Sequence, residues 1–262
     1  MSGEILCERL DDGRLARVTL SHPGKLNAMT ATMWRQLRQV MDELSADAAL
    51  RAVILRGAGV DFAAGGDIEE FLVERATPEQ AQRYHGEWVA GALAAIVECR
   101  HPVVAAICGA CVGGGLEIAG QCDLRIAGET ARFGAPIMRL GFSMAPAELA
   151  GLLALAGPAT ALEILLEGRL FGAAEALQKG LLTRVVADDA VEAEALATAR
   201  RIAAGAPLVA RTHKRLVRRL LAAAGTLDAA EQAASFGYLA TADYAEGMAA
   251  FLEKRAPEFR GE

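Results

Sequence analysis

Two glycine-rich segments of the chain have the residue types that can stabilise a negative charge with main-chain N–H groups. The first, Phe62–Asp67, follows the apolar run Ala52–Leu55, and the second, Gly113-Gly114-Gly115, follows the apolar run Val103–Ile107. Each is expected to join a buried strand to the start of a helix, where N–H groups have no acceptor within the helix. Two such groups converging on one oxygen would form an oxyanion hole. A phosphate-binding turn, or tight packing of a strand against a helix, would use glycine in the same way.

Glu117 is the acid–base candidate beside the second segment. It lies three residues after Gly114, in the first turn of the expected helix, so its side chain can share a face with the Gly114 amide. A carboxyl group there could move a proton to or from a substrate next to a carbonyl. Its sequence neighbours are apolar, and burial among them would raise the pKa of the Glu117 carboxyl. The alternative is an acid that complements the helix dipole, the interpretation we favour for Asp67, Glu69 and Glu70.

Nucleotide-binding motifs do not fit the glycine-rich parts of the chain. Gly57-Ala58-Gly59 is followed by Phe62 where the dinucleotide-binding motif requires a third glycine, and no Gly-Lys-Ser/Thr follows any glycine cluster. A nicotinamide-dependent oxidoreductase is therefore the least favoured alternative.

The composition is typical of a folded globular protein. The chain has 262 residues, a formal net charge of −6 and 53% hydrophobic residues. The mild acidity provides no general basic face for nucleic acid, so no nucleic-acid partner is expected. The basic cluster is interpreted as a solvated helix face; it consists of Lys214, Arg215, Arg218 and Arg219. The five cysteines are expected to be free thiols, most of them buried, and no metal site is predicted.

Neither a secretory signal nor a membrane span is expected. Met1–Ser21 lacks a long apolar block, and the longest uncharged stretch, Pro102–Leu116, is shorter than the roughly 20 apolar residues that cross a bilayer. We therefore expect a cytoplasmic protein.

Short apolar runs alternate with helical patterns over the first two-thirds of the chain. Thr30 is expected to cap a helix that continues to Leu44, and a second helix is expected at Pro78–Cys99. From about Ala147 the pattern is helical almost throughout. The predicted strands are Ile5–Leu10, Leu15–Leu20, Ala52–Leu55, Val103–Ile107, Leu124–Ala127 and Ala131–Phe133. This order predicts one α/β domain with a helical C-terminal part.

Four segments, taken together, resemble the crotonase superfamily, the enoyl-CoA hydratase/isomerase family. They are His22–Met29, Ala52–Glu70, Cys108–Leu124 and Glu246–Arg255. The resemblance implies a spiral of ββα turns in which residues 1–195 form the core with the thioester site. Residues 196–262 are then a C-terminal helical region of the same domain, which drives assembly of a homotrimer or a dimer of trimers. The implied substrate is an acyl-CoA; coenzyme A is part of it, so no separate cofactor is expected.

The resemblance also assigns roles to individual positions. Gly66 and Gly114 match the two oxyanion-hole amides, and Glu117 matches one of the two catalytic glutamates of the hydratases. Because the net charge is negative, local cations would have to attract the phosphates of coenzyme A. The positions that match substrate-contacting residues are Lys25, Leu26, Ala64, Asp67, Ile68, Glu69, Phe251 and Lys254, the last two often across a subunit boundary.

The chain departs from the hydratase pattern at one catalytic position. The second glutamate of the hydratases is replaced by Ile137, which cannot transfer a proton. Hydration calls for two carboxylates, whereas double-bond isomerisation needs one base that removes an α-proton and returns it at the γ-carbon. Glu148 could enter the site, although capping of its helix is the favoured interpretation. The leading hypothesis is an enoyl-CoA enzyme with Glu117 as the single proton shuttle; the alternative is a non-catalytic acyl-CoA-binding or scaffold protein.

Overall fold

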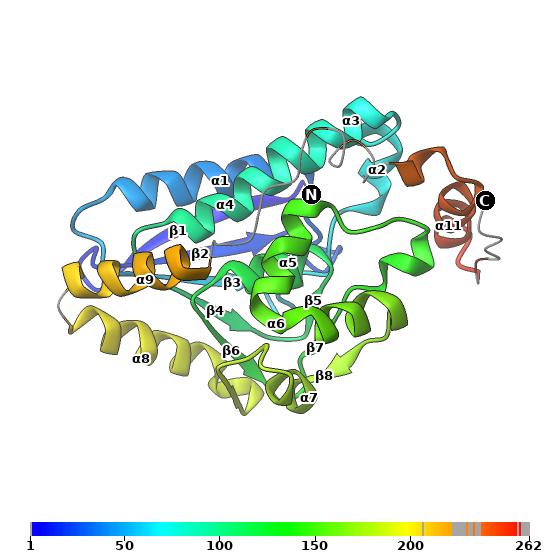
Figure 1. The fold of residues 1–262 in the computed structure, drawn as a ribbon. Coiled ribbons are helices and arrows are strands. Elements are labelled where there is room, and N and C mark those ends of the chain that lie inside the picture. Colours follow the sequence, from blue (N-terminus) through cyan, green and yellow to red (C-terminus); the bar gives the residue numbers. More distant parts are fainter. Residues whose placement is uncertain are drawn as a thin grey trace.

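Two sheets organise the chain, and helices lie on both sides of the larger one (Figure 1). The computed structural model describes residues 2–205, 207–221 and 237–255, with the single positions 229, 233 and 257. Within these residues the larger sheet has the strand order β1 (Glu4–Leu10), β2 (Leu15–Ser21), β3 (Ala52–Gly57), β4 (Val103–Ile107), β6 (Leu124–Gly128), β9 (Arg184–Val186). The smaller sheet has the order β5 (Ala110–Val112), β7 (Arg132–Gly134), β8 (Phe171–Gly172). The predicted α/β architecture is confirmed.

The larger sheet begins with an antiparallel hairpin and continues in parallel. Glu4 pairs with Ser21 and Leu10 with Leu15, and both strands were predicted from the sequence. From β2 onwards each strand pairs in parallel with its neighbour. Since β3 and β4 are parallel neighbours, the segments that follow them leave the sheet at the same edge. These segments contain the two glycine-rich turns.

Alternate side chains of the parallel strands enter two apolar clusters on opposite faces of the sheet. Val53 and Leu55 of β3 join the cluster of α1 (Ala31–Ala46) and α4 (Ala90–Glu98). Ile54, between them, joins the cluster of α8 (Val191–Ala203) on the other face. Such burial on both faces is typical of parallel strands and makes them read as continuous apolar runs.

The helix α1 begins and packs as its sequence predicted. The Thr30 side chain accepts a hydrogen bond from the Met33 N–H at 3.1 Å, which caps the first turn. The apolar face of α1 enters the core: Met33, Leu37, Met41 and Leu44 are buried, and Val40 is half-buried. The remaining helices are α2 (Ile68–Glu74), α3 (Pro78–Arg83), η1 (Tyr84–Val89), α5 (Gly114–Gln121), η2 (Pro136–Leu140), α6 (Pro146–Glu167), α7 (Ala173–Gln178), η3 (Asp188–Ala190), α9 (Pro207–Leu221), η4 (Gly237–Ala240) and α11 (Ala242–Leu252).

The structure corrects the sequence prediction in two regions. The chain after Ala147 contains the strands β8 and β9, where the pattern predicted helix almost throughout. They span two and three residues, too few for an alternating pattern to be visible. The helix predicted over Pro78–Cys99 is divided by η1, a π-helical turn between α3 and α4.

The basic cluster on α9 is not a solvated face throughout. Lys214 donates to the main-chain carbonyl of His101 at 3.0 Å, and its Nζ lies 2.9 Å from the Asp123 carboxylate. Arg218 lies 3.1 Å from the same carboxylate. These two cations fix α9 to the sheet, which sequence spacing cannot reveal; Arg215 is exposed, and the side chain of Arg219 lies outside the described residues. The predicted boundary between residues 195 and 196 falls inside α8 and stays a prediction.

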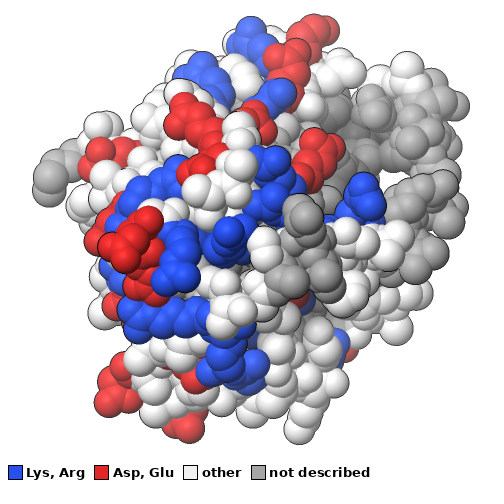
Figure 2. All heavy atoms as spheres, turned by 90° about the vertical axis from the view of Figure 1, so that its left-hand side faces the viewer, with Lys and Arg blue, Asp and Glu red and all other residues white. Residues whose placement is uncertain are grey.

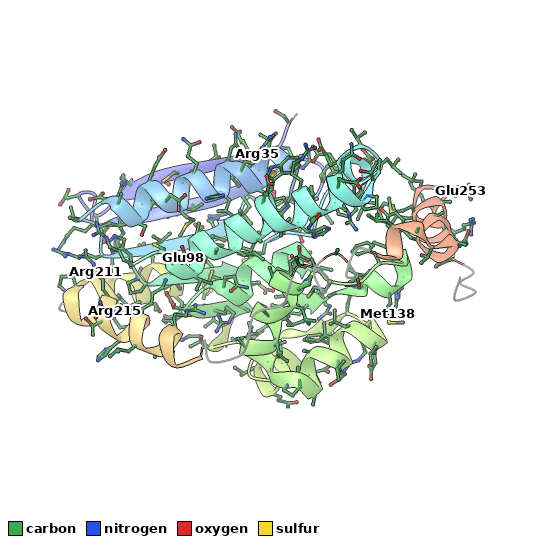
Figure 3. The ribbon with its side chains drawn as sticks, turned by 45° about the horizontal axis from the view of Figure 1, so that its top comes forward. Arg35, Glu98, Met138, Arg211, Arg215 and Glu253 are labelled. Atoms are coloured by element: carbon green, nitrogen blue, oxygen red, sulfur yellow. The ribbon has the colours of Figure 1, made fainter. Side chains whose placement is uncertain are left out.

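Lys and Arg side chains gather on the face where α8 ends and α9 begins, interleaved with Asp and Glu (Figure 2). Arg211 and Arg215 both project from α9 (Figure 3). Arg211 donates to the carbonyl of Ala48 at 3.0 Å, and Arg100 donates to the carbonyl of Ala46 at 2.6 Å. Arg100 and Arg211 therefore bind the C-terminal end of α1 and the loop after it. The absence of a nucleic-acid partner stays a prediction.

Among the described helices, α6 alone is long and apolar enough to cross a membrane, a test that core helices of soluble proteins also pass. Its backbone leaves helical geometry at Gly157, with φ 71° and ψ 169°, and Pro158 follows. The break leaves two segments that are each shorter than the roughly 20 residues of a span. That the chain binds no membrane stays a prediction.

Replacing Gly115 by alanine is expected to destabilise the protein by about 1–3 kcal/mol. A Cβ atom at this position would lie 2.1 Å from the Ala63 carbonyl oxygen, so the segments after β3 and β4 would have to move apart. Gly120→Ala is the matched control on α5, because its Cβ would meet only a Leu155 methyl group at 3.7 Å. Urea unfolding of both variants measures the effect. Equal stabilities for the two variants would contradict the close packing.

Candidate active site

The two glycine-rich turns meet at the edge of the larger sheet. A Cβ atom on Gly65 would lie 3.7 Å from the Gly114 nitrogen, and one on Gly113 would lie 3.6 Å from the Gly65 Cα. Gly65 has φ 110°, in the region that favours glycine. The bridges between Met29 and Gly66 and between Ala63 and Cys111 hold the first turn in place. The structure thus brings together the two turns that the sequence analysis singled out.

The amides of Gly66 and Gly114 become available in different ways. Gly114 is the first residue of α5, so its N–H has no acceptor in the helix. Gly66 precedes α2, whose N-cap is Asp67, so the expectation that this turn supplies a helix N-terminal amide is wrong for Gly66. Met29 instead bonds the neighbours of Gly66: its N–H donates to Gly65 at 2.7 Å and its carbonyl accepts from Asp67 at 2.9 Å. No described residue accepts from the Gly66 N–H.

A pocket of about 90 Å³ lies against both glycine turns. Gly66, Gly114 and Glu117 all line it, so the three predicted catalytic residues share one site. Ile137 of η2 also lines it and is 9% exposed, which places an apolar wall where the resemblance expects a carboxylate.

Burial raises the pKa of Glu117 well above its ordinary value, as the sequence predicted. The negative charge of Glu148 raises it further, and the guanidinium of Arg75 acts in the opposite direction. The protonated form of Glu117 is therefore favoured more than in an exposed carboxyl group, which suits a group that exchanges a proton with a substrate inside the pocket.

Glu148 has both of the roles that the sequence left open. It is the third residue of α6, and its carboxylate accepts a hydrogen bond from the Ala145 N–H at 3.2 Å, which caps the helix. It also lines the pocket, and its other oxygen lies 2.5 Å from Nδ1 of His85. Both side chains are buried, at 3% and 6% exposure.

Two buried residues near Glu117 and Glu148, His85 and Arg75, were not predicted from the sequence. His85 lies in a helical segment without a recognisable motif, and its contact with Glu148 joins positions 63 residues apart. Arg75 is buried with its guanidinium 4.0 Å from the Phe71 ring and 4.5 Å from the Phe142 ring. A buried cation between aromatic faces is stabilised there by the ring electrons. Neither contact has a signal in the local sequence.

Six of the positions matched to substrate contacts lie around the first glycine turn. Lys25 Nζ is 2.7 Å from the Glu69 carboxylate and 3.8 Å from that of Asp67. The hydrogen bond with Glu69 raises the pKa of Lys25, and the same bond lowers the pKa of Glu69.

The Ala64 N–H donates to the Leu26 carbonyl at 3.0 Å, and both Ala64 and Ile68 line the pocket. Asp67 accepts from the Glu69 N–H at 3.1 Å and is the N-cap of α2, so it lies at a helix start, as its predicted interaction with the helix dipole requires.

Phe251 and Lys254 do not line this pocket within one chain. Both are exposed, at the end of α11 and just beyond it. The helix packs closely on η2, where a Cβ on Gly247 would lie 2.3 Å from the Leu140 carbonyl oxygen. Figure 3 places Met138 of η2 and Glu253 at the same end of the molecule. A contact of these two residues with substrate from a neighbouring subunit stays a prediction.

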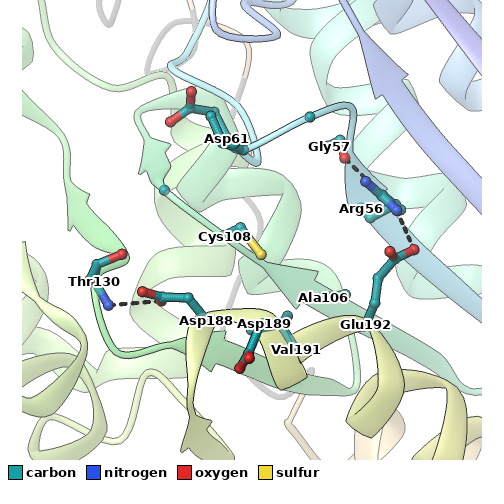
Figure 4. Close-up of a pocket in the computed structure, with 13 residues that line it drawn as sticks. Arg56, Gly57, Asp61, Ala106, Cys108, Thr130, Asp188, Asp189, Val191 and Glu192 are labelled. Atoms are coloured by element: carbon teal, nitrogen blue, oxygen red, sulfur yellow. Dashed lines mark hydrogen bonds and ion pairs between the residues drawn. The ribbon is translucent and has the colours of Figure 1, made fainter.

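A larger cavity, of about 580 Å³, contains none of the predicted site residues (Figure 4). Four of its five charged side chains make contacts within the fold. Asp61 accepts from the Ala110 N–H at 2.8 Å, Asp188 accepts from the Thr130 N–H at 3.0 Å, and Arg56 pairs with Glu192. The glycine turns and Glu117 make the smaller pocket the candidate active site.

Comparisons with known proteins agree on one family. A sequence model described as enoyl-CoA hydratase/isomerase matches residues 11–262. A probable enoyl-CoA hydratase of Mycobacterium bovis is 38% identical over 258 residues, which cover 97% of each chain.

Solved structures support the same conclusion about the fold. An enoyl-CoA hydratase/carnithine racemase from Magnetospirillum magneticum is 49% identical, with a TM-score of 0.81 over 98% of this chain and 96% of that chain. A methylmalonyl-CoA decarboxylase complexed with 2S-carboxypropyl CoA is 27% identical, with a TM-score of 0.87 over 100% of both chains. The crotonase-like fold implied by the resemblance is therefore confirmed.

Glu117→Gln is expected to change stability in a pH-dependent way. Because the native pKa of Glu117 is raised above the unfolded value of about 4.3, the native state keeps a proton that the unfolded state releases. The free energy of unfolding of the wild type therefore falls as the pH rises from about 4.3 toward the raised native pKa. The glutamine variant has no carboxyl group at this position, so this fall is absent. We expect urea unfolding to show that the free energy of unfolding of the variant, relative to that of the wild type, is higher at about pH 8 than at about pH 5. The same difference in unfolding free energy at both values would contradict a raised pKa.

Proposed function

Because this chain belongs to the enoyl-CoA hydratase/isomerase family, we propose that it catalyses proton transfer at the α-carbon of an enoyl-CoA. The reaction passes through a thioester enolate whose oxygen is held by the amides of Gly66 and Gly114, with Glu117 carrying the proton. One observation carries the proposal: two main-chain N–H groups and a carboxyl group with a raised pKa line the same pocket. This combination is what enolate chemistry beside a carbonyl requires.

The oxyanion hole acts on the charge that develops as the α-proton moves. The thioester oxygen becomes negative in the enolate, and the Gly66 and Gly114 amides donate hydrogen bonds to it. Such preorganised donors contribute about 10²–10³ in rate each. Since both amides belong to backbone fixed by bridges and by a helix start, they need little rearrangement during the reaction.

Ile137 stands where the hydratases have their second glutamate, and this difference affects which reaction the pocket can catalyse. Double-bond isomerisation needs one base, which removes a proton from the α-carbon and returns it at the γ-carbon, and Glu117 is sufficient for this. Hydration also needs a group that takes a proton from water, and Ile137 cannot do so. The isoleucine at this position also favours the second candidate, an acyl-CoA-binding or scaffold protein without turnover.

Coenzyme A binding is assigned to the matched positions outside the pocket. Lys25 is paired with Glu69 at the surface, and exposed pairs of this kind are weak enough for a phosphate to replace the carboxylate. Phe251 and Lys254 are proposed to approach the substrate of a neighbouring subunit in a homotrimer or a dimer of trimers. The protein is proposed to act in the cytoplasm, and the chemistry described uses no cofactor beyond the coenzyme A of the substrate.

Exchange of the α-proton provides the test. In D₂O the wild type should introduce deuterium at C2 of a saturated acyl-CoA, measured by mass spectrometry. Glu117→Gln should exchange about 10²–10⁴-fold more slowly, because the proton carrier is removed. Its Kd for the acyl-CoA, measured by calorimetry, should be close to that of the wild type.

Two results would contradict the proposal. Unchanged exchange in Glu117→Gln would remove Glu117 from the mechanism. A wild type that binds acyl-CoA but neither exchanges the α-proton nor converts 2-enoyl- or 3-enoyl-CoA would establish the non-catalytic alternative.

A further inference from the structure

Glu148 is a second carboxylate in the pocket, at a position for which the family resemblance assigns no role. It lines the pocket together with Glu117 and the two glycine amides. Its charge is one cause of the raised pKa of Glu117, so the two carboxyl groups are close enough to interact through the protein interior. The pocket therefore contains two carboxyl groups even though Ile137 occupies the family position of the second one.

Two contacts fix the orientation of the Glu148 carboxylate. One oxygen accepts from the Ala145 N–H at the start of α6, where the helix dipole also favours a negative charge. The other lies 2.5 Å from Nδ1 of His85, a distance at which the two groups must share a hydrogen. A buried carboxylate with an imidazole partner is suited to accept a proton and to release it again.

The position of His85 depends on an unusual backbone segment. His85 belongs to the π-helical turn η1, between α3 and α4. Tyr84, His85 and Val89 of this turn are all buried and all line the pocket. π-helical turns are rare and are frequent at functional sites.

We propose that Glu148 is the second catalytic acid–base residue, that His85 is its positioning residue, and that the enzyme adds water to a trans-2-enoyl-CoA. This inference rests on the proposed enolate chemistry at Gly66, Gly114 and Glu117. The function lost at Ile137 is thus supplied from the start of α6, eleven residues later in the chain.

The hydration step balances with the groups in the pocket. The Glu148 carboxylate takes a proton from water while the water oxygen bonds to C3. The π electrons of the C2–C3 double bond move toward the thioester, and the resulting enolate oxygen is held by Gly66 and Gly114. The Glu117 carboxylic acid gives its proton to C2, which yields a 3-hydroxyacyl-CoA. The proton on the Glu148–His85 pair then returns to solvent, and Glu117 takes up another.

The competing explanation is that Glu148 and His85 only stabilise the fold, as a helix cap and its partner. The Glu148→Gln variant distinguishes a catalytic role from a structural one. Its amide oxygen can still accept a hydrogen bond from the Ala145 N–H, and its side chain fills the same space. The matched control is Glu70→Gln: the Glu70 carboxylate accepts from the Ala31 N–H at 2.7 Å at the start of α1, and Glu70 does not line the pocket.

The experiment measures two reactions for each protein: hydration of a trans-2-enoyl-CoA, followed by the mass of one added water, and α-proton exchange of a saturated acyl-CoA in D₂O. The wild type and Glu70→Gln should perform both. Glu148→Gln should lose hydration by about 10²–10⁴-fold and keep α-proton exchange within about tenfold. Glu117→Gln should lose both reactions.

The positioning role of His85 is tested by measuring kcat and KM of two variants. His85→Leu should lower kcat for hydration without changing KM, while α-proton exchange continues. His85→Gln should recover part of the loss, because its amide N–H can still donate to Glu148. Equal effects of the two substitutions on all parameters would assign His85 a purely structural role and overturn this part of the proposal.

The outcomes distinguish this inference from the function on which it rests. A wild type without α-proton exchange overturns both. A wild type that exchanges the α-proton through Glu117, but adds no water or adds it equally well after Glu148→Gln, overturns only the role of Glu148.

Discussion

Strands β3 and β4 are parallel neighbours, so the glycine turns that follow them leave the same edge of the sheet and come into contact. Two main-chain hydrogen bonds join the first turn to β5, which leads into the second turn: Ala63 N–H to the Ala110 carbonyl at 2.9 Å and Val112 N–H to the Ala63 carbonyl at 3.0 Å. A side chain on Gly115 would force the turns apart. The two proposed donor groups are therefore main-chain atoms at the edge of the sheet, and their position depends on the packing of the segments that follow β3 and β4.

The charged groups of the pocket interact electrostatically with one another. A buried carboxylate is costly unless it is paired or protonated. Glu148 has the Ala145 N–H and His85 as partners, whereas burial and the nearby charge of Glu148 raise the pKa of Glu117. Arg75, held between two aromatic rings, partly offsets the negative charge. Two carboxyl groups in different environments are thus available for different steps of one reaction.

What the sequence allowed us to predict was local or carried by a family pattern. Thr30 as a helix cap and Glu117 beside Gly114 follow from spacing within one helix turn. Gly66 was identified through its motif, although its amide is made available by the bridge to Met29 rather than by a helix start. The larger sheet followed from apolar runs, but β8 and β9 were too short to produce a pattern.

The features that escaped prediction depend on contacts between distant parts of the chain. His85 and Glu148 are 63 residues apart, and Lys214 reaches an Asp123 carboxylate from α9. Glu148 illustrates the limit well: its spacing from the start of α6 predicted the cap, and only the arrangement of η1 and α6 shows that it also lines the pocket. Local sequence patterns indicate the role of a side chain within its own helix or turn. Tertiary packing determines which side chains from distant segments come into contact.

The proposed mechanism requires the Gly66 and Gly114 amides to bind one thioester oxygen next to Glu117. A crystal structure of the protein with a saturated acyl-CoA would show this contact. We expect the thioester oxygen at about 2.7–3.1 Å from both nitrogens, with the α-carbon facing the Glu117 carboxyl group. A thioester bound elsewhere, or an oxygen in contact with neither amide, would contradict it.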